Sequence, residues 1–388
     1  MLNVPLFDRV MKERCTMLGV GPMSKACVDS AIQLSAECKL PLMLIASRRQ
    51  IDSEQMGGGY VNNWSTEEFA RYVSNCDNVE NLWLCRDHGG PWQSEKEKNA
   101  GLSLEKAMES AKQSFEVDIA SGFKVIHLDP SIDFEGNLDV EAALERLFEL
   151  YEFCWAVAQK NKKEVIFEIG TEEQSGSTNS AAELTYTLDR VTSFCAKHKM
   201  PAPTFVVVQT GTRVLETRNV GSFSSSLRIK GELAPEIQIP QMVEICQRYG
   251  VMIKQHNSDY LPTQDLCWMP NLNIHSANVA PEFGVEETKS LLALMDNYKL
   301  KILKDRFLEL AFNSGKWKKW MIKDSNATDV DRAIIAGHYV FSTSEFLEIK
   351  KEMAENLNQV GIDLEHQLVE DVKASILRYV TSFRLGRQ

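Results

Sequence analysis

Three adjacent ionisable residues follow a short apolar run in the segment NLWLCRDHGGPWQ, residues 81–93. The apolar residues 82–85 lead directly into Arg86, Asp87 and His88, before a Gly-Gly-Pro breaker. A carboxylate can accept and return a proton, and a neutral imidazole can bind a metal ion. Because side chains alternate along a strand, Asp87 and His88 can both face one cavity only if the strand ends there. The pattern predicts a strand that presents reactive groups at its tip.

Eight short β-type runs recur along the chain, each followed by a polar or Gly-rich stretch and then by a helical pattern. They are residues 16–20, 42–46, 82–85, 124–128, 164–169, 204–208, 251–254 and 272–275. Continuous apolar strands separated by helices indicate an α/β protein with a parallel sheet covered on both faces. Eight such units predict a (β/α)8 TIM barrel over residues 1–285, with a C-terminal helical extension over 286–388 packed on it. An open doubly wound sheet is the alternative, but the glycine fingerprint of dinucleotide-binding folds is missing after the first strand.

Composition and charge exclude several classes of function. The net charge of −11 disfavours binding to a nucleic-acid backbone, which requires a basic face. We expect a cytoplasmic protein, because no apolar run approaches the roughly 20 residues of a membrane span and no signal-peptide pattern opens the chain. The nine cysteines are scattered without CxxC pairs, which is typical of reduced thiols, so any metal must be held by histidine and oxygen ligands.

Polar side chains gather at the ends of the predicted strands, where the catalytic loops of a barrel lie. They are Arg48, Arg49, Asp87, His88, Asp129, Glu168, Glu172, Gln209, His256, Ser258, Asp259, His275 and Asn278. Each alone has an ordinary explanation: a lone strand-end histidine is more often structural than a ligand, and Asp129 could simply cap a turn. Their convergence on one cavity would be costly without a metal or a substrate. Two or more neutral imidazoles with an oxygen ligand suit Zn²⁺, with Mn²⁺ or Co²⁺ as alternatives.

Several collinear motifs resemble those of the class II, metal-dependent aldolases, and more closely the non-catalytic Z-type subunits of D-tagatose-1,6-bisphosphate aldolase. The motifs are RDHGGPWQ, GFKVIHLDPS, FEIGTEE, VVVQTG and QHNSDY, together with WKKW at 317–320 in the helical tail. The resemblance implies that His88 and His256 bind a metal ion. It also implies that Asp87 moves a proton on the hydroxyl next to the breaking carbon–carbon bond. Asn278 lies in a segment, SANV, that resembles the KVNI of catalytic members, whose asparagine helps to form the active site.

Two departures from the family pattern matter. Catalytic members place a third metal-binding histidine after the sixth strand, where this chain has Gln209, as Z-type members do. Gln209 could supply an amide oxygen, or the site could be weaker. Arg48 and Arg49 stand where relatives carry small polar residues, and two guanidinium groups near the cavity suggest a phosphate or carboxylate on the substrate. The alternative is a solvated surface pair among acidic neighbours.

Residues and resemblance together predict a metal-dependent retro-aldol enzyme, an aldolase or a 4-epimerase, that acts on a ketose, a ketose phosphate or a related acidic sugar. The predicted site comprises catalytic Asp87, Glu172 and Asn278, metal ligands His88, His256, Gln209 and Glu168, and substrate-binding Arg48, Arg49, Asp129, Ser258, Asp259 and His275. The alternative is a non-catalytic barrel that stabilises a separate aldolase subunit, and a small-molecule binding module without chemistry is a weaker third reading. Homo-oligomers or a catalytic subunit are the protein partners that the sequence leaves open, while nucleic acid and membrane are not expected.

Overall fold

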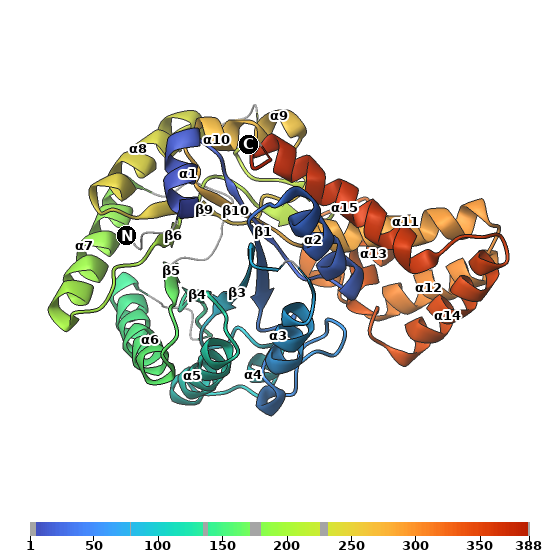
Figure 1. The fold of residues 1–388 in the computed structure, drawn as a ribbon, viewed down its shortest axis with the longest axis horizontal. Helices are drawn as coiled ribbons and strands as arrows, with labels where there is room; N and C mark the ends of the chain where they lie inside the picture. The colour runs from blue at the N-terminus through green and yellow to red at the C-terminus, as the bar shows by residue number, and fades with distance from the viewer. Residues whose placement is uncertain (1–4, 78, 135–138, 171–179, 226–231, 387–388) are drawn as a thin grey trace.

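The computed structural model describes residues 5–77, 79–134, 139–170, 180–225 and 232–386, and its centre is a closed parallel barrel (Figure 1). The strand order around the barrel is β1-β10-β9-β6-β5-β4-β3-β2. The strands are β1 (Met17–Val20), β2 (Leu42–Ser47), β3 (Leu82–Gly89), β4 (Val125–Leu128), β5 (Ile166–Ile169), β6 (Phe205–Val207), β9 (Met252–Gln255) and β10 (Ser276–Val279). The predicted TIM barrel is confirmed. A short antiparallel pair, β7 (Val214–Leu215) and β8 (Arg218–Asn219), stands outside it.

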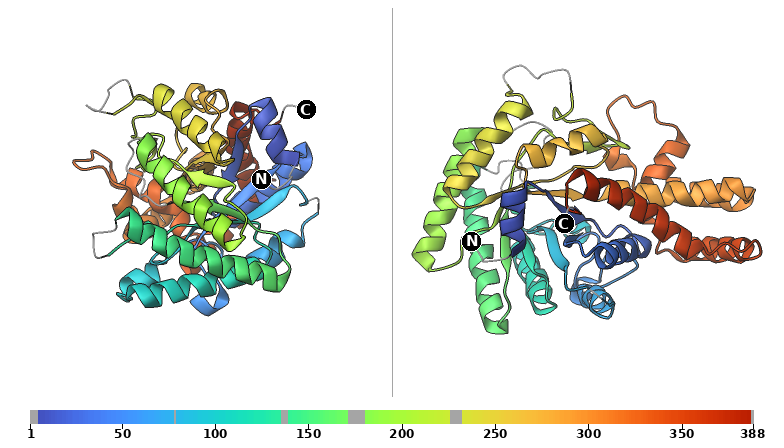
Figure 2. Two further views of the ribbon diagram at one scale, coloured as in Figure 1. Left: turned by 90° about the vertical axis from the view of Figure 1, so that its left-hand side faces the viewer. Right: turned by 45° about the horizontal axis from the view of Figure 1, so that its top comes forward.

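Helices surround the barrel, as the turned views in Figure 2 show. They are α1 (Pro5–Glu13), α2 (Lys25–Cys38), α3 (Thr66–Ser74), α4 (Glu95–Asn99), α5 (Leu104–Ala120), α6 (Val140–Asn161), α7 (Ala181–His198), α8 (Pro235–Arg248), α9 (Thr263–Leu266) and α10 (Trp268–Asn271), with the 3₁₀ turn η1 (Glu54–Met56). Ser180 and Glu183 form a capping box that satisfies backbone N–H groups at the start of α7. Helix α1 closes the amino end of the barrel, because its buried Phe7 packs edge-on against Trp83 and Phe205.

The C-terminal helices form a lobe and then return to the barrel (Figure 1). They are α11 (Pro281–Asn297), α12 (Lys301–Asn313), α13 (Asp329–Ala336), α14 (Ser344–Asn358) and α15 (Leu364–Ser382), with the 3₁₀ turns η2 (Lys318–Trp320) and η3 (Gly337–Tyr339). Phe307 and Met353 belong to a second hydrophobic core within the lobe. Helix α15 instead places Val372 and Ile376 in the barrel core. The expected boundary between residues 285 and 286 falls inside α11, so the lobe and the barrel share a helix.

The eighth strand of the barrel begins later than the sequence predicts. The prediction of a strand over 272–275 is wrong, because β10 starts at Ser276. Asn273 has a φ of +57°, in the left-handed region, so extended backbone cannot run through it. His275 consequently lies at the amino end of β10, whereas Asn278 lies within the strand.

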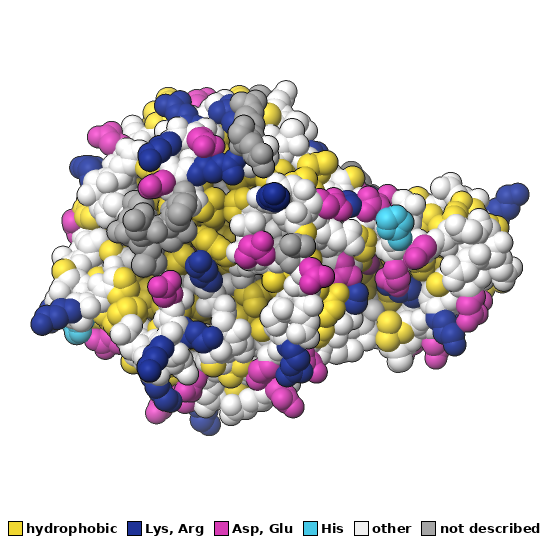
Figure 3. Space-filling model, in the orientation of Figure 1, with side chains coloured by type: hydrophobic (Ala, Val, Ile, Leu, Met, Phe, Trp, Pro, Cys, Tyr) yellow, Lys and Arg dark blue, Asp and Glu magenta, His cyan; other side chains and the backbone are white. Residues whose placement is uncertain are grey.

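The charges on one face of the molecule and the character of its helices can be compared with the expectations from the sequence. On the face shown in Figure 3, basic and acidic side chains are interspersed, and no broad basic patch is visible. Among the residues that the structure describes, no helix combines the length and the apolar character that crossing a bilayer would require.

Candidate active site

A cavity of about 400 Å³ lies at the carboxyl ends of the barrel strands. Its volume suits a small organic molecule such as a sugar. The strand-end residues that line it are Asp87, His88, His127, Asp129, His256 and Asn278. We call these residues, together with the adjacent Glu168, the floor of the cavity. Most of them were expected from the sequence to meet at this place.

The tip of β3 brings Asp87 and His88 to the cavity by an irregularity in the strand. The strand runs on to Gly89 instead of ending at Cys85, and its register with β4 shifts between Arg86 and Gly89. His88 has a φ of +45°, which breaks the alternation of side chains so that it follows Asp87 into the cavity. A Cβ atom on Gly89 would lie 2.8 Å from the His127 carbonyl oxygen, so only glycine allows this close approach. The side chain of Arg86 does not line the cavity and forms a buried ion pair instead.

His88 is oriented by a carboxylate. Its Nδ1 lies 2.6 Å from Oδ2 of Asp129. Asp129 is itself held by the Gln93 amide at 2.8 Å and by the backbone N–H of Ser131 at 3.0 Å. Burial acts to lower the pKa of His88, but the carboxylates of Asp87 and Asp129 outweigh it and raise the pKa to about 9. With its Nδ1 hydrogen directed at Asp129, His88 presents Nε2 to the cavity, where either a proton or a metal ion can occupy the lone pair.

His256, directly after β9, has the same arrangement on the opposite side. Its Nε2 lies 3.0 Å from Oε1 of Glu168, and its Nδ1 lies 3.3 Å from Nε2 of His88. The other oxygen of Glu168 accepts a hydrogen bond from Nζ of buried Lys254 at 2.5 Å. Burial would raise the pKa of Glu168, but Lys254 and the imidazoles lower it to about 2. Burial lowers the pKa of His256. Both oxygens of Glu168 are therefore engaged, and two imidazoles backed by carboxylates face each other.

A third imidazole, that of His127 on β4, was not among the predicted ligands. Its ring centroid lies 5.3 Å from that of His88 and 5.1 Å from that of His256. Its Nδ1 accepts a hydrogen bond from the backbone N–H of His88 at 3.1 Å. Its buried Nε2 has no hydrogen-bond partner among the described residues. The signal was present in the sequence: His127 is two positions before Asp129, so both side chains project from one face of the strand.

Asp87 lies beside the three imidazoles. Its Oδ1 accepts a hydrogen bond from Nδ2 of Asn278 at 3.1 Å, and lies 3.7 Å from Nδ1 of His127 and 3.8 Å from Nε2 of His256. Burial would raise its pKa, but His88, His256 and His127 together bring the pKa well below the usual range of a carboxyl group. Asp87 is therefore an ionised carboxylate that can accept a proton.

The donor set of the floor fits a divalent metal ion. Nitrogen atoms of His88, His127 and His256 all lie within 4.8 Å of one another. Two nitrogen ligands about 2.0–2.1 Å from one tetrahedral ion would be about 3.3 Å apart. That is the separation found between His88 and His256. A neutral His127 whose Nδ1 accepts a hydrogen bond carries its hydrogen on Nε2, so this buried N–H lacks an acceptor among the described residues and indicates that a polar group other than protein lies nearby.

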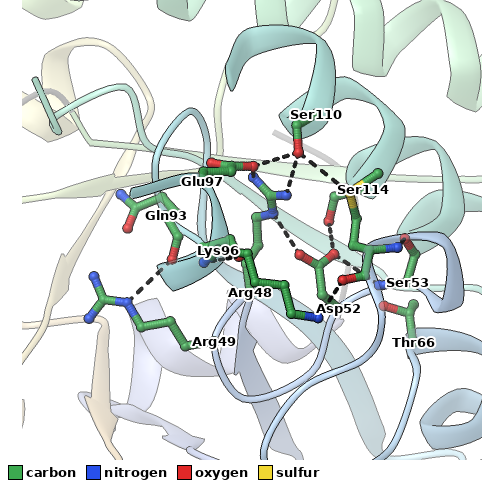
Figure 4. Close-up of polar contacts among 12 residues, drawn as sticks. Arg48, Arg49, Asp52, Ser53, Thr66, Gln93, Lys96, Glu97, Ser110 and Ser114 are labelled. Atoms are coloured by element: carbon green, nitrogen blue, oxygen red, sulfur yellow. Dashed lines mark hydrogen bonds and ion pairs between the residues drawn. The ribbon is translucent and has the colours of Figure 1, made fainter. Parts of the chain in front are cut away.

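The two adjacent arginines after β2 lie in different environments, as Figure 4 shows. Arg48 is buried and does not line the cavity, because it forms ion pairs with Asp52 at 3.0 Å and Glu97 at 2.7 Å. Arg49 runs away from that cluster and lines the cavity, and its Nε donates to the carbonyl oxygen of Gln93 at 3.3 Å. The structure therefore brings only one of the two predicted anion-binding arginines to the cavity.

Three predicted substrate-binding residues have structural partners. Asp259 lines the cavity, but its Oδ1 accepts hydrogen bonds from the backbone N–H groups of Ala280 and Glu282, both at 2.9 Å. It thereby caps the start of α11, and burial together with Glu282 raises its pKa to about 7. Ser258 is fully buried and does not line the cavity, and its hydroxyl oxygen accepts a hydrogen bond from Nε2 of Gln255 at 2.9 Å. His275 is at the other end of its strand, where Nδ1 accepts from the backbone N–H of Ile253 at 3.0 Å, and burial lowers its pKa to about 4.

Two predicted residues of the metal and catalytic sets are placed differently. Gln209 follows β6 and is buried, but it does not line the cavity. Glu172 lies outside the described residues, so its expected catalytic role stays a prediction.

The C-terminal lobe contributes one wall of the cavity. Lys319, Trp320 and Tyr339 line it, although the sequence placed the active site in the barrel alone. Nε1 of Trp320 donates to the hydroxyl of Tyr339 at 3.1 Å, and the carbonyl oxygen of Trp320 accepts from the backbone N–H of Glu216 at 2.7 Å. The motif at 317–320, noted in the sequence without a role, thus reaches the site by folding back from the tail.

Comparison with known protein families supports the relationship inferred from the motifs. Residues 8–200 match the sequence model of a family described as D-tagatose-1,6-bisphosphate aldolase subunit GatZ/KbaZ-like. The predicted family resemblance is confirmed. Among curated proteins, no sequence matches the chain significantly.

Solved structures with the same fold share little sequence with this chain. A probable tagatose 6 phosphate kinase from Sinorhizobium meliloti 1021 has a TM-score of 0.74 at 16% identity, covering 95% of this chain and all of the other. The fructuronate-tagaturonate epimerase UxaE from Cohnella laeviribosi has a TM-score of 0.54 at 11% identity, over 96% and 81% of the two chains. The fructose-bisphosphate aldolase of Campylobacter jejuni has a TM-score of 0.51 at 9% identity, over 96% and 92%. At these identities the likeness establishes the fold alone.

Proposed function

We propose that this protein is a metal-dependent enzyme that acts on a ketose, a ketose phosphate or a related acidic sugar by retro-aldol chemistry, as an aldolase or a 4-epimerase. One observation carries the proposal: nitrogens of His88 and His256 face each other at 3.3 Å, while the opposite nitrogen of each ring points at a carboxylate. Two ring nitrogens that face each other at this distance hold either a proton or a metal ion between them, and a divalent ion would displace the proton. The resemblance to class II aldolases and the adjacent Asp87 connect that cation to sugar chemistry.

The proposed ligands are His88, His256 and His127. Zn²⁺ is expected, with Mn²⁺ and Co²⁺ as alternatives, because three imidazoles suit each of these ions. A divalent ion bound there would polarise the carbonyl group of the ketose. Asp129 and Glu168 then act as outer partners that fix the tautomers of His88 and His256. Glu168 thus orients a ligand instead of serving as one.

Asp87 is the proposed base. It accepts the proton of the substrate hydroxyl next to the bond that breaks. The electrons of that O–H bond form the carbonyl of the departing aldehyde fragment, and the electron pair of the carbon–carbon bond passes to the ketone fragment. Asn278 keeps Asp87 in place through its hydrogen bond. In an aldolase the aldehyde leaves, and the carbon of the ketone fragment that received the electron pair takes up a proton. In a 4-epimerase the aldehyde turns over, that electron pair forms the carbon–carbon bond again on the other face of the aldehyde, and Asp87 returns the proton to the oxygen of the new hydroxyl group.

The metal proposal is tested by elemental analysis of the purified protein and three variants. His88→Ala, His127→Ala and His256→Ala should each weaken metal binding about 10- to 100-fold or more. His198→Ala is the matched control, since His198 ends α7 and pairs with Glu152 at 2.7 Å, away from the cavity. Equal metal content in the parent and all four variants would refute the assignment.

The second candidate function is a non-catalytic subunit that stabilises a separate aldolase. The specific observation in its favour is the family description, which names a subunit, together with Gln209 at the position of a metal-binding histidine in catalytic members. The same analysis separates the two: a well-folded protein that binds no Zn²⁺, Mn²⁺ or Co²⁺ when these are supplied would favour the subunit.

A further inference from the structure

Two cationic side chains from distant parts of the chain line the cavity near its mouth. Arg49 comes from the loop after β2, and Lys319 comes from η2 in the C-terminal lobe. We propose that Arg49 and Lys319 together bind an oxyanion, a phosphate or a carboxylate, on the substrate, and that the lobe thereby makes the enzyme specific for acidic sugars. The statement about the sugar rests on the proposed function, whereas the statement about the oxyanion rests on the two side chains.

Arg49 is held so that part of its guanidinium group is available to a ligand. Its Nε donates to the carbonyl oxygen of Gln93 at 3.3 Å. Neither of its terminal nitrogens forms a hydrogen bond or an ion pair with a described residue. The side-chain amide of Gln93 donates to Asp129, which orients His88. The same glutamine therefore anchors both the arginine and the floor, which fixes the oxyanion site relative to the reacting end of the substrate.

Lys319 is held by aromatic rings instead of by a carboxylate. Its Nζ lies 5.1 Å from the ring centroid of Trp320 and 5.0 Å from that of Tyr339. Within the described part of the chain, no acidic side chain forms an ion pair with it. Glu95, an acidic neighbour in the cavity wall, is engaged by Lys316 at 2.6 Å. Loss of hydration within the cavity walls lowers the pKa of Lys319 to about 8, and repulsion from Arg49 acts in the same direction.

The charge arrangement around the two cations calls for a mobile counterion. In a chain with a net charge of −11, this wall of the cavity has one carboxylate among its described residues, Glu95, that acts on the three cations Lys316, Lys319 and Arg49 and forms its ion pair with Lys316. The wall therefore carries an excess of positive charge. Arg48 gives the contrast, since two carboxylates satisfy it within the protein. Tyr339 adds a neutral donor: its oxygen accepts from Trp320, and its own hydroxyl hydrogen has no acceptor among the described residues. A guanidinium fork, an ammonium and a hydroxyl suit an oxyanion.

Titration calorimetry with three probes tests the proposal: fructose 6-phosphate, glucuronate and neutral fructose. The parent protein should bind one acidic probe at least about tenfold more tightly than fructose. Lys319→Gln and Arg49→Gln should each weaken that probe by about tenfold or more, with fructose unchanged. Lys319→Arg, which keeps the charge, should retain much of the preference. Lys318→Gln is the matched control, because Lys318 is the neighbouring lysine of η2 and does not line the cavity.

The identity of the preferred acidic probe separates phosphate from carboxylate as the recognised group. Equal binding of the acidic probes by Lys319→Gln and Lys318→Gln would overturn the proposal, and so would a parent protein that prefers neither acidic probe to fructose. Metal content and thermal unfolding are measured on the same samples. A protein without metal that still loses acid binding in Lys319→Gln would refute the retro-aldol function and leave the oxyanion site standing.

Discussion

The floor and the mouth of the cavity are built on different principles. On the floor, each reactive side chain has a partner in the barrel: Asp129 holds His88, and Glu168 holds His256. At the mouth, Arg49 and Lys319 come from segments about 270 residues apart, and among the described residues neither forms an ion pair with a carboxylate. Rigid strand ends therefore hold the proposed reacting groups in place, whereas the proposed recognition of the substrate depends on how the lobe packs against the barrel.

Asp87→Asn should have the largest effect on activity and should leave the floor intact. The amide keeps the shape of the side chain but cannot accept the proton, so turnover should fall by about 10²- to 10⁴-fold with metal retained. Steady-state rates with ketose phosphates and uronates, paired with metal analysis, measure this. Near-normal turnover with full metal content would mean that Asp87 is only a strand-end residue.

The adjacent arginines allow a sharp contrast between structure and recognition. Arg48→Ala leaves Asp52 and Glu97 buried without their partner, so the free energy of unfolding should fall by about 3–5 kcal/mol. Arg49→Ala should change it by less than about 1 kcal/mol but should raise KM for an acidic substrate. Urea unfolding and steady-state kinetics on both variants give the comparison. If the two variants are equally destabilised, Arg49 is also structural.

His127 and Gln209 compete as the third ligand of the floor. The structure favours His127, which offers a ring nitrogen within 4.8 Å of those of His88 and His256, so His127→Ala should weaken metal binding about 10- to 100-fold. Gln209→Ala should change it little, because Gln209 does not line the cavity. Competition with a chelator measures both affinities, and the reverse order would restore Gln209 as a ligand.

The smallest expected effect is a pH dependence at the mouth. With its pKa lowered to about 8, Lys319 is a cation below that pH and loses its charge above it. Affinity for the preferred acidic probe should therefore be fully present near pH 7 and fall by up to about tenfold towards pH 9.5. The charged and titratable groups that also act on Lys319 are Arg49, Glu95, Lys98, Lys316 and His338. Lys319→Gln should give a flatter profile, and an identical profile would assign the titration to another group.

Much of the floor could be predicted because barrel geometry follows from local patterns. Apolar runs that alternate with helices determine eight strands, and a strand end places Asp87, His88 and His256 at one rim. The error at 272–275 arose because an apolar run resembles a strand. The left-handed backbone of Asn273, which delays the start of β10, cannot be read from the pattern of apolar residues.

The rest of the site depends on contacts that the sequence does not encode locally. Nothing in two consecutive arginines distinguishes Arg48, whose distant partner Glu97 approaches it only after folding, from Arg49. Lys319 enters the cavity because the lobe returns to the barrel, a tertiary arrangement. His127 differs from these residues because a local signal was present: its spacing from Asp129 indicated that both side chains share one face of the strand.

The return of α15 to the barrel has a consequence for synthesis of the protein. The backbone N–H of Thr16 donates to the carbonyl oxygen of Phe383 at 3.0 Å, so the first strand is secured by a residue near the far end of the chain. A ribosome delivers Phe383 long after Thr16, at about 5–20 residues per second. The nascent barrel therefore waits for tens of seconds with an incomplete wall. Contacts of such long sequence separation favour slow closure, and this interval is when chaperones would be most needed.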